Sequence, residues 1–195
     1  MNNDLSMLVN EIRACQICCG DIPAPRPVLR VSNTARILIA GQAPGTRVHA
    51  SGKPFTDPSG DRLRDWMGVG EDVFYDEKRI AILPMGFCFP GLDAKGGDKP
   101  PRPICARTWR ERVLAYLPDI QLTLVIGGYA MKWHAKDIWT GAVTTTVARW
   151  NEARGGVIPL PHPSWRNNAW IKKNAWFSQD VLPELRQRVQ AVLQD

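Results

Sequence analysis

Four short apolar runs, separated by helical patterns, constrain the fold of this chain more than any other feature of its sequence. The runs are residues 36–40, 80–83, 122–126 and 157–160. Each is nearly continuous in Ile, Leu, Val and Ala, which is typical of strands buried on both faces of a parallel sheet. The fourth run is the weakest, because Pro159 cannot donate a hydrogen bond to a central ladder. The pattern predicts four parallel strands.

The segments around these runs have the spacing of amphipathic helices. Leu5, Leu8 and Ile12 predict an N-terminal helix that ends near residues 15–20. Strand and helix then alternate, so we expect an α/β fold, a three-layer α/β/α sandwich with a central four-stranded parallel sheet. No repeat or linker divides the 195 residues, and we expect a single domain over 1–195. The other expected helices are 59–67, with Ser59 as N-cap, 106–117, 129–135, 144–153, 165–173 and 179–193.

Polar and glycine-rich segments follow each of the four runs. They are 41–45 (Gly-Gln-Ala-Pro-Gly), 84–88, 127–129 and 161–164 (Pro-His-Pro-Ser). In a parallel sheet these segments all lie at the carboxyl edge, where open α/β folds bind ligands. Segment 41–45 lacks the Gly-Lys-Ser/Thr ending of a P-loop, and a motif of this kind, taken alone, is more often a structural turn. His162 is held between two prolines at this edge, which favours a functional role.

Five cysteines make a disulfide framework a poor interpretation of an intracellular chain, and favour a metal or cluster site. Cys15 and Cys18 form a Cys-x2-Cys pair, whereas Cys88 and Cys105 lie in the middle of the chain. Four such thiolates can close a zinc site or hold a [4Fe–4S] cluster. The alternative is that Cys88 and Cys105 are small buried hydrophobes. Cys19 remains as an extra thiol.

The charge of the chain makes a polyanionic partner one candidate, although a charge of this size also suits a merely soluble protein. With 25 Lys and Arg against 19 Asp and Glu, its formal net charge is +6. The first residues lack a signal peptide pattern and no apolar run is long enough for a membrane span, so we expect a cytoplasmic protein. Residues 161–176 hold three cationic side chains, three Trp and no acid, as a nucleic-acid surface does. We expect Trp170 and Trp176 to be core anchors, and Trp165 and Arg166 to contact the partner.

Taken together and in order, these motifs resemble the uracil-DNA glycosylase superfamily, most closely its iron–sulfur family 4 branch. Residues 52–55 (Gly-Lys-Pro-Phe) belong to the same series. The resemblance implies a monofunctional DNA glycosylase that hydrolyses the N-glycosidic bond of uracil in DNA and so initiates base excision repair. It also implies DNA as the partner, no membrane, and a monomer. The expected cofactor is a [4Fe–4S] cluster, with zinc as the alternative, on Cys15, Cys18, Cys88 and Cys105.

The resemblance assigns roles to residues at the carboxyl edge. A base must be flipped out of the duplex before it can be excised, and Phe55 is expected to stack on it. His162 is expected to donate a hydrogen bond to the departing base as negative charge develops on it. Trp165 and Arg166 are expected to fill the gap in the helix. The substrate-binding residues are expected to be Gly41, Gln42, Ala43, Phe55, Pro84 and His162, and the DNA-binding residues Ser164, Trp165, Arg166 and Asn167.

The first motif departs from the family pattern. Family 4 has Glu where this chain has Gln42, and family 1 has Asp at the position of Ala43. We include Gln42 with His162 in the catalytic site, although an amide cannot act as a base. Asp57 is expected to orient the attacking water, with His49, in a polar loop, and Asp61 as reserves. Alternatively no base is needed, and leaving-group stabilisation carries the rate.

A second departure lies after the second run, where Pro84 occupies the position of the family 4 Asn that reads uracil. A proline offers no side-chain donor, so we expect activity on other deaminated bases, such as xanthine or hypoxanthine. Two alternatives stay open. The chain could be a glycosylase that prefers a deaminated purine, or a damaged-DNA-binding protein that has lost its chemistry.

Overall fold

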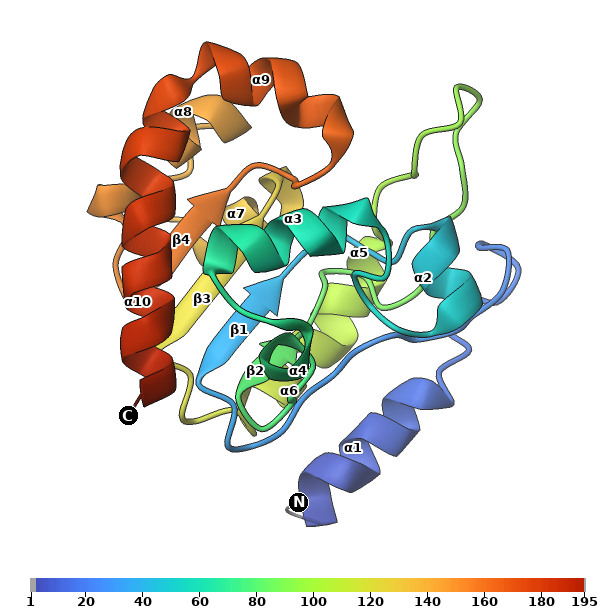
Figure 1. The fold of residues 1–195 in the computed structure, drawn as a ribbon. Coiled ribbons are helices and arrows are strands. Elements are labelled where there is room, and N and C mark those ends of the chain that lie inside the picture. The colour runs from blue at the N-terminus through green and yellow to red at the C-terminus, as the bar shows by residue number, and fades with distance from the viewer. Residues whose placement is uncertain (1–2, 195) are drawn as a thin grey trace.

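The computed structural model describes residues 3–194, and its centre is a four-stranded parallel sheet with the order β2-β1-β3-β4 (Figure 1). The register places Ile37 opposite both Ile80 and Leu122, and Leu124 opposite Ile158. The predicted α/β fold with four parallel strands is therefore confirmed. Pro159 lies in an edge strand, where its missing N–H is tolerated. The strands are β1 (Ile37–Ala40), β2 (Ile80–Ile82), β3 (Leu122–Ile126) and β4 (Val157–Leu160).

Helices cover both faces of the sheet. They are α1 (Asn3–Arg13), α2 (Thr46–Ser51), α3 (Pro58–Met67), α4 (Glu71–Phe74), α5 (Pro103–Cys105), α6 (Glu111–Leu114), α7 (Gly128–His134), α8 (Val143–Ala148), α9 (Asn168–Lys173) and α10 (Leu182–Gln194). Short 3-10 turns, Trp150–Glu152 and Trp165–Asn167, and π-helical turns, Ala106–Arg110 and Phe177–Val181, adjoin some of them. Within residues 3–194, none of these helices has the length and apolarity to cross a bilayer.

The predicted helices are present, but several of their details were wrong. The N-cap of α3 is Asp57, not Ser59, because the Asp57 carboxylate accepts a hydrogen bond from the Gly60 N–H at 3.3 Å. The helix expected over 106–117 begins at Pro103 and contains a π-helical turn. His49 lies in α2, where a polar loop was expected.

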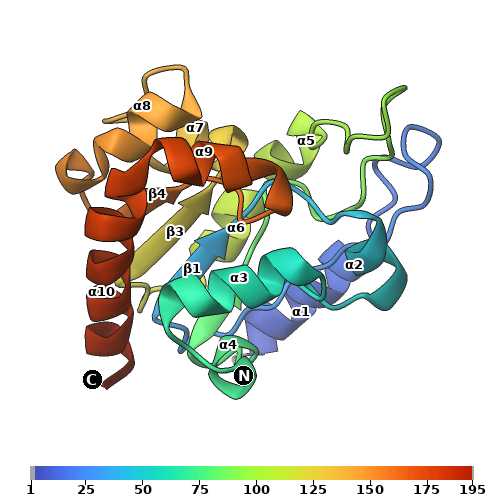
Figure 2. The ribbon, with the colours of Figure 1, turned by 45° about the horizontal axis from the view of Figure 1, so that its top comes forward.

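The two faces of the sheet belong to two hydrophobic cores, because alternate residues of a strand point to opposite faces. Ile37 and Ile39 pack with the buried sides of α3 and α10, whereas Leu38 packs with α1 and with Trp109. Figures 1 and 2 show α3 and α10 on one side of the sheet and α1 on the other. This arrangement leaves the carboxyl edge of the strands free for a site.

One charged side chain, Arg110, is completely buried behind that edge. Its guanidinium donates to the carbonyl oxygens of Leu83, at 3.2 Å, and Pro84, at 2.9 Å, where the chain leaves β2. Its Nε–H donates to Nε2 of His134 at 2.7 Å. Burial and the nearby cation lower the pKa of His134 to about 3, so this imidazole stays neutral and accepts the hydrogen bond. Arg110 thereby fixes the segment that carries Pro84.

Candidate active site

The segments that leave all four strands meet at one pocket. Segment 41–45 follows β1, Pro84 follows β2, Ile126 ends β3 and His162 follows β4, and all of them line the pocket. Phe55 and Asp57 close it from the side of α3. Its volume of about 100 Å³ exceeds the roughly 10–15 Å³ that one water molecule needs. The predicted convergence at the carboxyl edge is therefore present.

The first motif lines this pocket with backbone as well as side-chain groups. The carbonyl oxygens of Gly41 and Gln42 accept hydrogen bonds from the N–H groups of Met85 and Gly86, both at 2.9 Å. Within residues 3–194 the N–H groups of Gln42 and Ala43 have no partner, although both residues line the pocket. A Cβ on Gly41 would lie 3.9 Å from the tip of the Phe55 ring, so the motif passes close under that ring. Unpartnered N–H groups of this kind suit an anionic or carbonyl oxygen.

Phe55 is held in a strained conformation as one wall of the pocket. Its φ of +55° is uncommon for a residue with a side chain. The Tyr75 hydroxyl donates to the carbonyl oxygens of Pro54, at 2.8 Å, and Phe55, at 3.0 Å. A Cβ on Gly60 would come within 1.9 Å of the same Phe55 oxygen, so α3 can pack here only because residue 60 is glycine. Backbone strain that the surroundings enforce in this way is typical of functional sites.

His162 presents one defined nitrogen to the pocket. The Ser164 N–H donates to Nδ1 of His162 at 3.2 Å, and the Asn167 side-chain amide donates to the His162 carbonyl oxygen at 2.6 Å. Because Nδ1 accepts, the neutral ring carries its proton on Nε2, which can donate to a ligand. The residue is exposed at the mouth of the pocket, yet desolvation of the imidazole by its surroundings lowers its pKa, against the opposing effect of Asp57 and Asp98. The ring is therefore a neutral hydrogen-bond donor at neutral pH.

Of the three acid–base candidates for water activation, only Asp57 lines the pocket. Its Oδ1 caps α3, and it faces the same space as His162. The reserves lie elsewhere. The His49 ring packs against Phe89, with centroids 5.6 Å apart, and Asp61 forms an ion pair with Arg64 on the exposed side of α3.

Sequence reasoning missed a second carboxylate, that of Asp98, which also lines the pocket. It comes from the segment that joins β2 to α5, and a Cβ on Gly45 would lie 3.4 Å from its Oδ2. Burial raises the pKa of Asp98, Asp57 and Asp93 act in the same direction, and Arg166 and His162 oppose them. The sequence offered one signal for Asp98: it is an acidic residue in a glycine-rich segment between Cys88 and Cys105. That segment has no periodic pattern, so nothing in the sequence distinguishes it from an ordinary loop.

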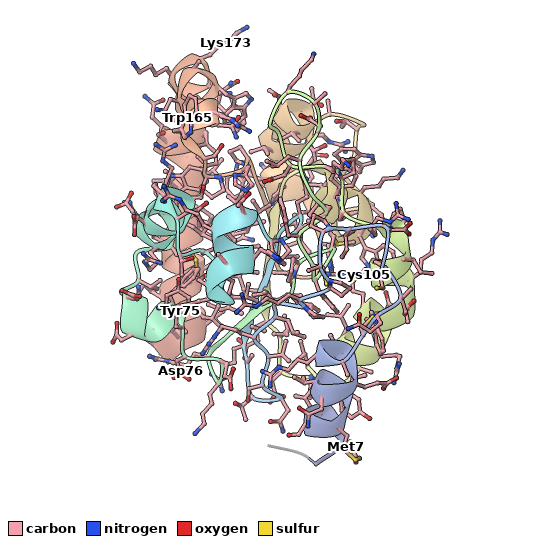
Figure 3. All side chains as sticks on the ribbon, turned by 90° about the vertical axis from the view of Figure 1, so that its right-hand side faces the viewer. Met7, Tyr75, Asp76, Cys105, Trp165 and Lys173 are labelled. Atoms are coloured by element: carbon pink, nitrogen blue, oxygen red, sulfur yellow. The ribbon has the colours of Figure 1, made fainter. Side chains whose placement is uncertain are left out.

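The pocket opens into a wider outer groove of about 620 Å³. Arg47 of α2 and Ser164, Trp165 and Arg166 line this groove. Trp165 is 71% exposed, and the Arg166 guanidinium lies 5.9 Å from the centre of its ring. Figure 3 shows Trp165 at the end of the molecule that carries α9. Asn167 does not line the groove, because its amide holds the His162 carbonyl.

The other two tryptophans of this stretch are partly buried and pack against the core, which agrees with their expected role as anchors. Trp170 and Trp176 pack edge-to-face with ring centroids 5.8 Å apart, and both rings contact Phe177. The Trp170 indole N–H donates to the Thr144 hydroxyl at 2.7 Å.

Cys15, Cys18, Cys88 and Cys105 line a second, largely apolar cavity, whereas Cys19 is exposed outside it. The Phe87 N–H donates to Sγ of Cys105 at 3.3 Å. Burial raises the pKa of Cys88 to about 11 and that of Cys105 to about 12. In residues 3–194, no three or more Cys, His, Asp or Glu side chains stand close enough together to hold a single metal ion. Figure 3 shows Cys105 well away from Trp165.

A comparison with known protein families decides the family. A family model of the uracil DNA glycosylase superfamily matches residues 30–186. The chain belongs to the uracil DNA glycosylase superfamily. Membership in the superfamily implies DNA glycosylase activity on damaged bases, and its enzymes are typically monofunctional N-glycosylase hydrolases that bind damaged DNA. The matched range includes Phe55, Asp57, Asp98 and His162, but it begins after the Cys-x2-Cys pair.

The position of His162 in this uracil DNA glycosylase fold predicts its titration. NMR of the imidazole should give a midpoint below the ordinary value of about 6.5, because burial disfavours the charged ring. Asp57→Asn should move the midpoint further down, since the Asp57 charge raises the pKa of His162. His134 serves as an internal reference, because its pKa near 3 keeps it neutral over the same range. A midpoint above the ordinary value would contradict the assigned environment.

Proposed function

We propose that this superfamily member belongs to the family 4 branch and excises uracil from DNA by hydrolysis of the N-glycosidic bond. The observation that carries the proposal is that His162, whose Nδ1 accepts from the Ser164 N–H and so leaves Nε2–H free to donate, lines one pocket with the Phe55 ring. A flipped base can stack on that ring while its oxygen meets the imidazole donor. Trp165 and Arg166 on the outer groove would then occupy the space that the base has left.

The chemistry needs stabilisation of two charges. As the glycosidic bond breaks, negative charge develops on the base and positive charge on the sugar. The Nε2–H of His162 and the free N–H groups of Gln42 and Ala43 are donors for the departing base. The carboxylate of Asp57 lies on the same pocket, where it stabilises the sugar cation and orients the water. The residues that line the pocket include no lysine, in keeping with hydrolysis without strand cleavage.

A second candidate function follows from the wall that Pro84 forms. The Pro84 side chain offers no hydrogen-bonding group, and its carbonyl oxygen is already engaged by Arg110 at 2.9 Å. This wall therefore selects a base by steric fit and not by hydrogen bonds. Gln42 supplies the only side-chain amide that lines the described pocket. Such a pocket accommodates hypoxanthine or xanthine as well as uracil.

We also propose that Cys15, Cys18, Cys88 and Cys105 hold a [4Fe–4S] cluster. The residues fit this group, since four free thiols surround one apolar cavity and a backbone N–H already donates to one sulfur. A single zinc ion fits less well, because it needs its four ligands gathered tightly around one point, and within residues 3–194 no three such side chains stand close enough to hold one metal ion. The cluster would be structural and would tie the segment after α1 to the middle of the chain.

The activity is tested with single-lesion oligonucleotides that contain uracil, hypoxanthine or xanthine, followed by alkaline cleavage at abasic sites. Uracil should be excised, and the purines should also react if the Pro84 wall reads only shape. Phe55→Ala should lower the rate strongly in an identical preparation, because the base loses its stacking surface. Equal product from both preparations would indicate a contaminating glycosylase. Tight binding of lesion DNA without any product would favour the non-catalytic alternative.

The cluster is tested by iron and acid-labile sulfide analysis with visible absorption of protein purified without oxygen. We expect iron and sulfide in equal amounts, lost in Cys105→Ser and retained in the matched variant Cys19→Ser. Bound zinc in place of iron would overturn the cofactor alone, whereas an equal loss in both variants would contradict the assigned ligand set.

A further inference from the structure

The segment that carries Asp98 keeps its own shape without the help of the Asp98 side chain. This segment, 91–101, projects from the carboxyl edge of the sheet (Figure 1). The Lys99 N–H donates to the Gly91 carbonyl oxygen at 2.9 Å, and the Asp93 carboxylate accepts from the N–H groups of Lys95 and Gly97. Within residues 3–194 the Asp98 carboxylate has neither a hydrogen-bond donor nor an ion-pair partner.

That free carboxylate stands where the base pocket meets the outer groove, since Asp98 lines both. Charged groups face it from every side. His162 and Arg166 face it from the segment after β4, Asp57 from the N-cap of α3, and Asp93 from its own segment. From α2, Arg47 lines the same groove.

We propose that Asp98 is the catalytic base that takes a proton from the attacking water, while Asp57 orients that water. This inference rests on the proposed glycosylase function. Gln42 cannot accept the proton as a base, and one oxygen of Asp57 is committed to the helix cap. Asp98 supplies the carboxylate that the first motif lacks, from a segment distant in sequence.

The step balances without any further reactant. The water oxygen forms a bond to C1′ of the sugar and transfers one proton to Asp98. The electron pair of the C1′–N bond leaves with the base, whose oxygen accepts the hydrogen bond from Nε2 of His162. The products are an abasic sugar hydroxyl and the base anion, which regains a proton from Asp98 or from solvent.

The environment of Asp98 suits this role. Burial and the neighbouring acids raise its pKa above that of an ordinary carboxyl, and a general base works best when its pKa approaches the operating pH. Only the ionised form accepts a proton. The excision rate should therefore rise as pH increases through the pKa of Asp98.

The test is the pH profile of single-turnover excision of uracil for the wild type, Asp98→Asn, Asp98→Glu and Asp93→Asn. Asp98→Asn should lose about 10²-fold or more in rate. It should also lose the acidic limb of the profile, the range over which the wild-type rate rises with pH as Asp98 ionises. It should bind the same DNA at least as tightly, because a negative charge near the phosphates has been removed. Asp98→Glu should retain the acidic limb. Asp93→Asn, which alters the same segment, should also retain it.

The outcomes separate this proposal from the one on which it depends. A wild type that is active, with Asp98→Asn close to it in rate and profile, would overturn the role of Asp98 alone. An equal loss in Asp93→Asn with the acidic limb kept in both variants would also overturn it, in favour of a structural role for the segment. A wild type inactive on every lesion would overturn both proposals.

Discussion

The parallel direction of all four strands is the constraint on which the site depends. Because β1 to β4 run the same way, every strand delivers its following segment to one edge, and helices must fill the faces. Segment 41–45, Pro84 and His162 come from distant parts of the chain, yet they line one pocket for this reason. An antiparallel pair anywhere in the sheet would send one of them to the opposite end.

Packing and hydrogen bonds then hold the pocket residues of these segments in defined positions. Arg110 anchors the carbonyl groups beside Pro84 from inside the core, at the cost of burying a cation. Gly60 and the Tyr75 hydroxyl hold Phe55 in its strained conformation. The Ser164 N–H selects the tautomer of His162. Each of these interactions lies behind a pocket residue, so the site is organised before any DNA binds.

The strands, the order of the helices and most of the residues that line the pocket could be predicted from the sequence. Apolar runs predict buried strands, and the Gly-, Pro- and His-containing segments after them predict the edge where the pocket lies. The fourth strand shows how far this reaches, since Pro159 made it the weakest of the four predicted strands, and the fold accommodates the proline by placing that strand at the edge of the sheet. Asp98 and Arg110 could not be predicted. One is an acid in an irregular segment and the other a cation in a π-helical turn, and only the tertiary fold shows that one faces the pocket and the other is buried behind it.

The central claim is that the pocket stabilises a departing base through the Nε2–H of His162. Its most direct test is the single-turnover excision rate of His162→Ala with a uracil-containing duplex, beside His49→Ala, in which a histidine outside the pocket is removed. Loss of one preorganised donor to developing charge costs about 10²–10³-fold in rate. We predict that loss for His162→Ala with unchanged DNA affinity, and a nearly normal rate for His49→Ala. Equal rates for His162→Ala and the wild type would contradict the account.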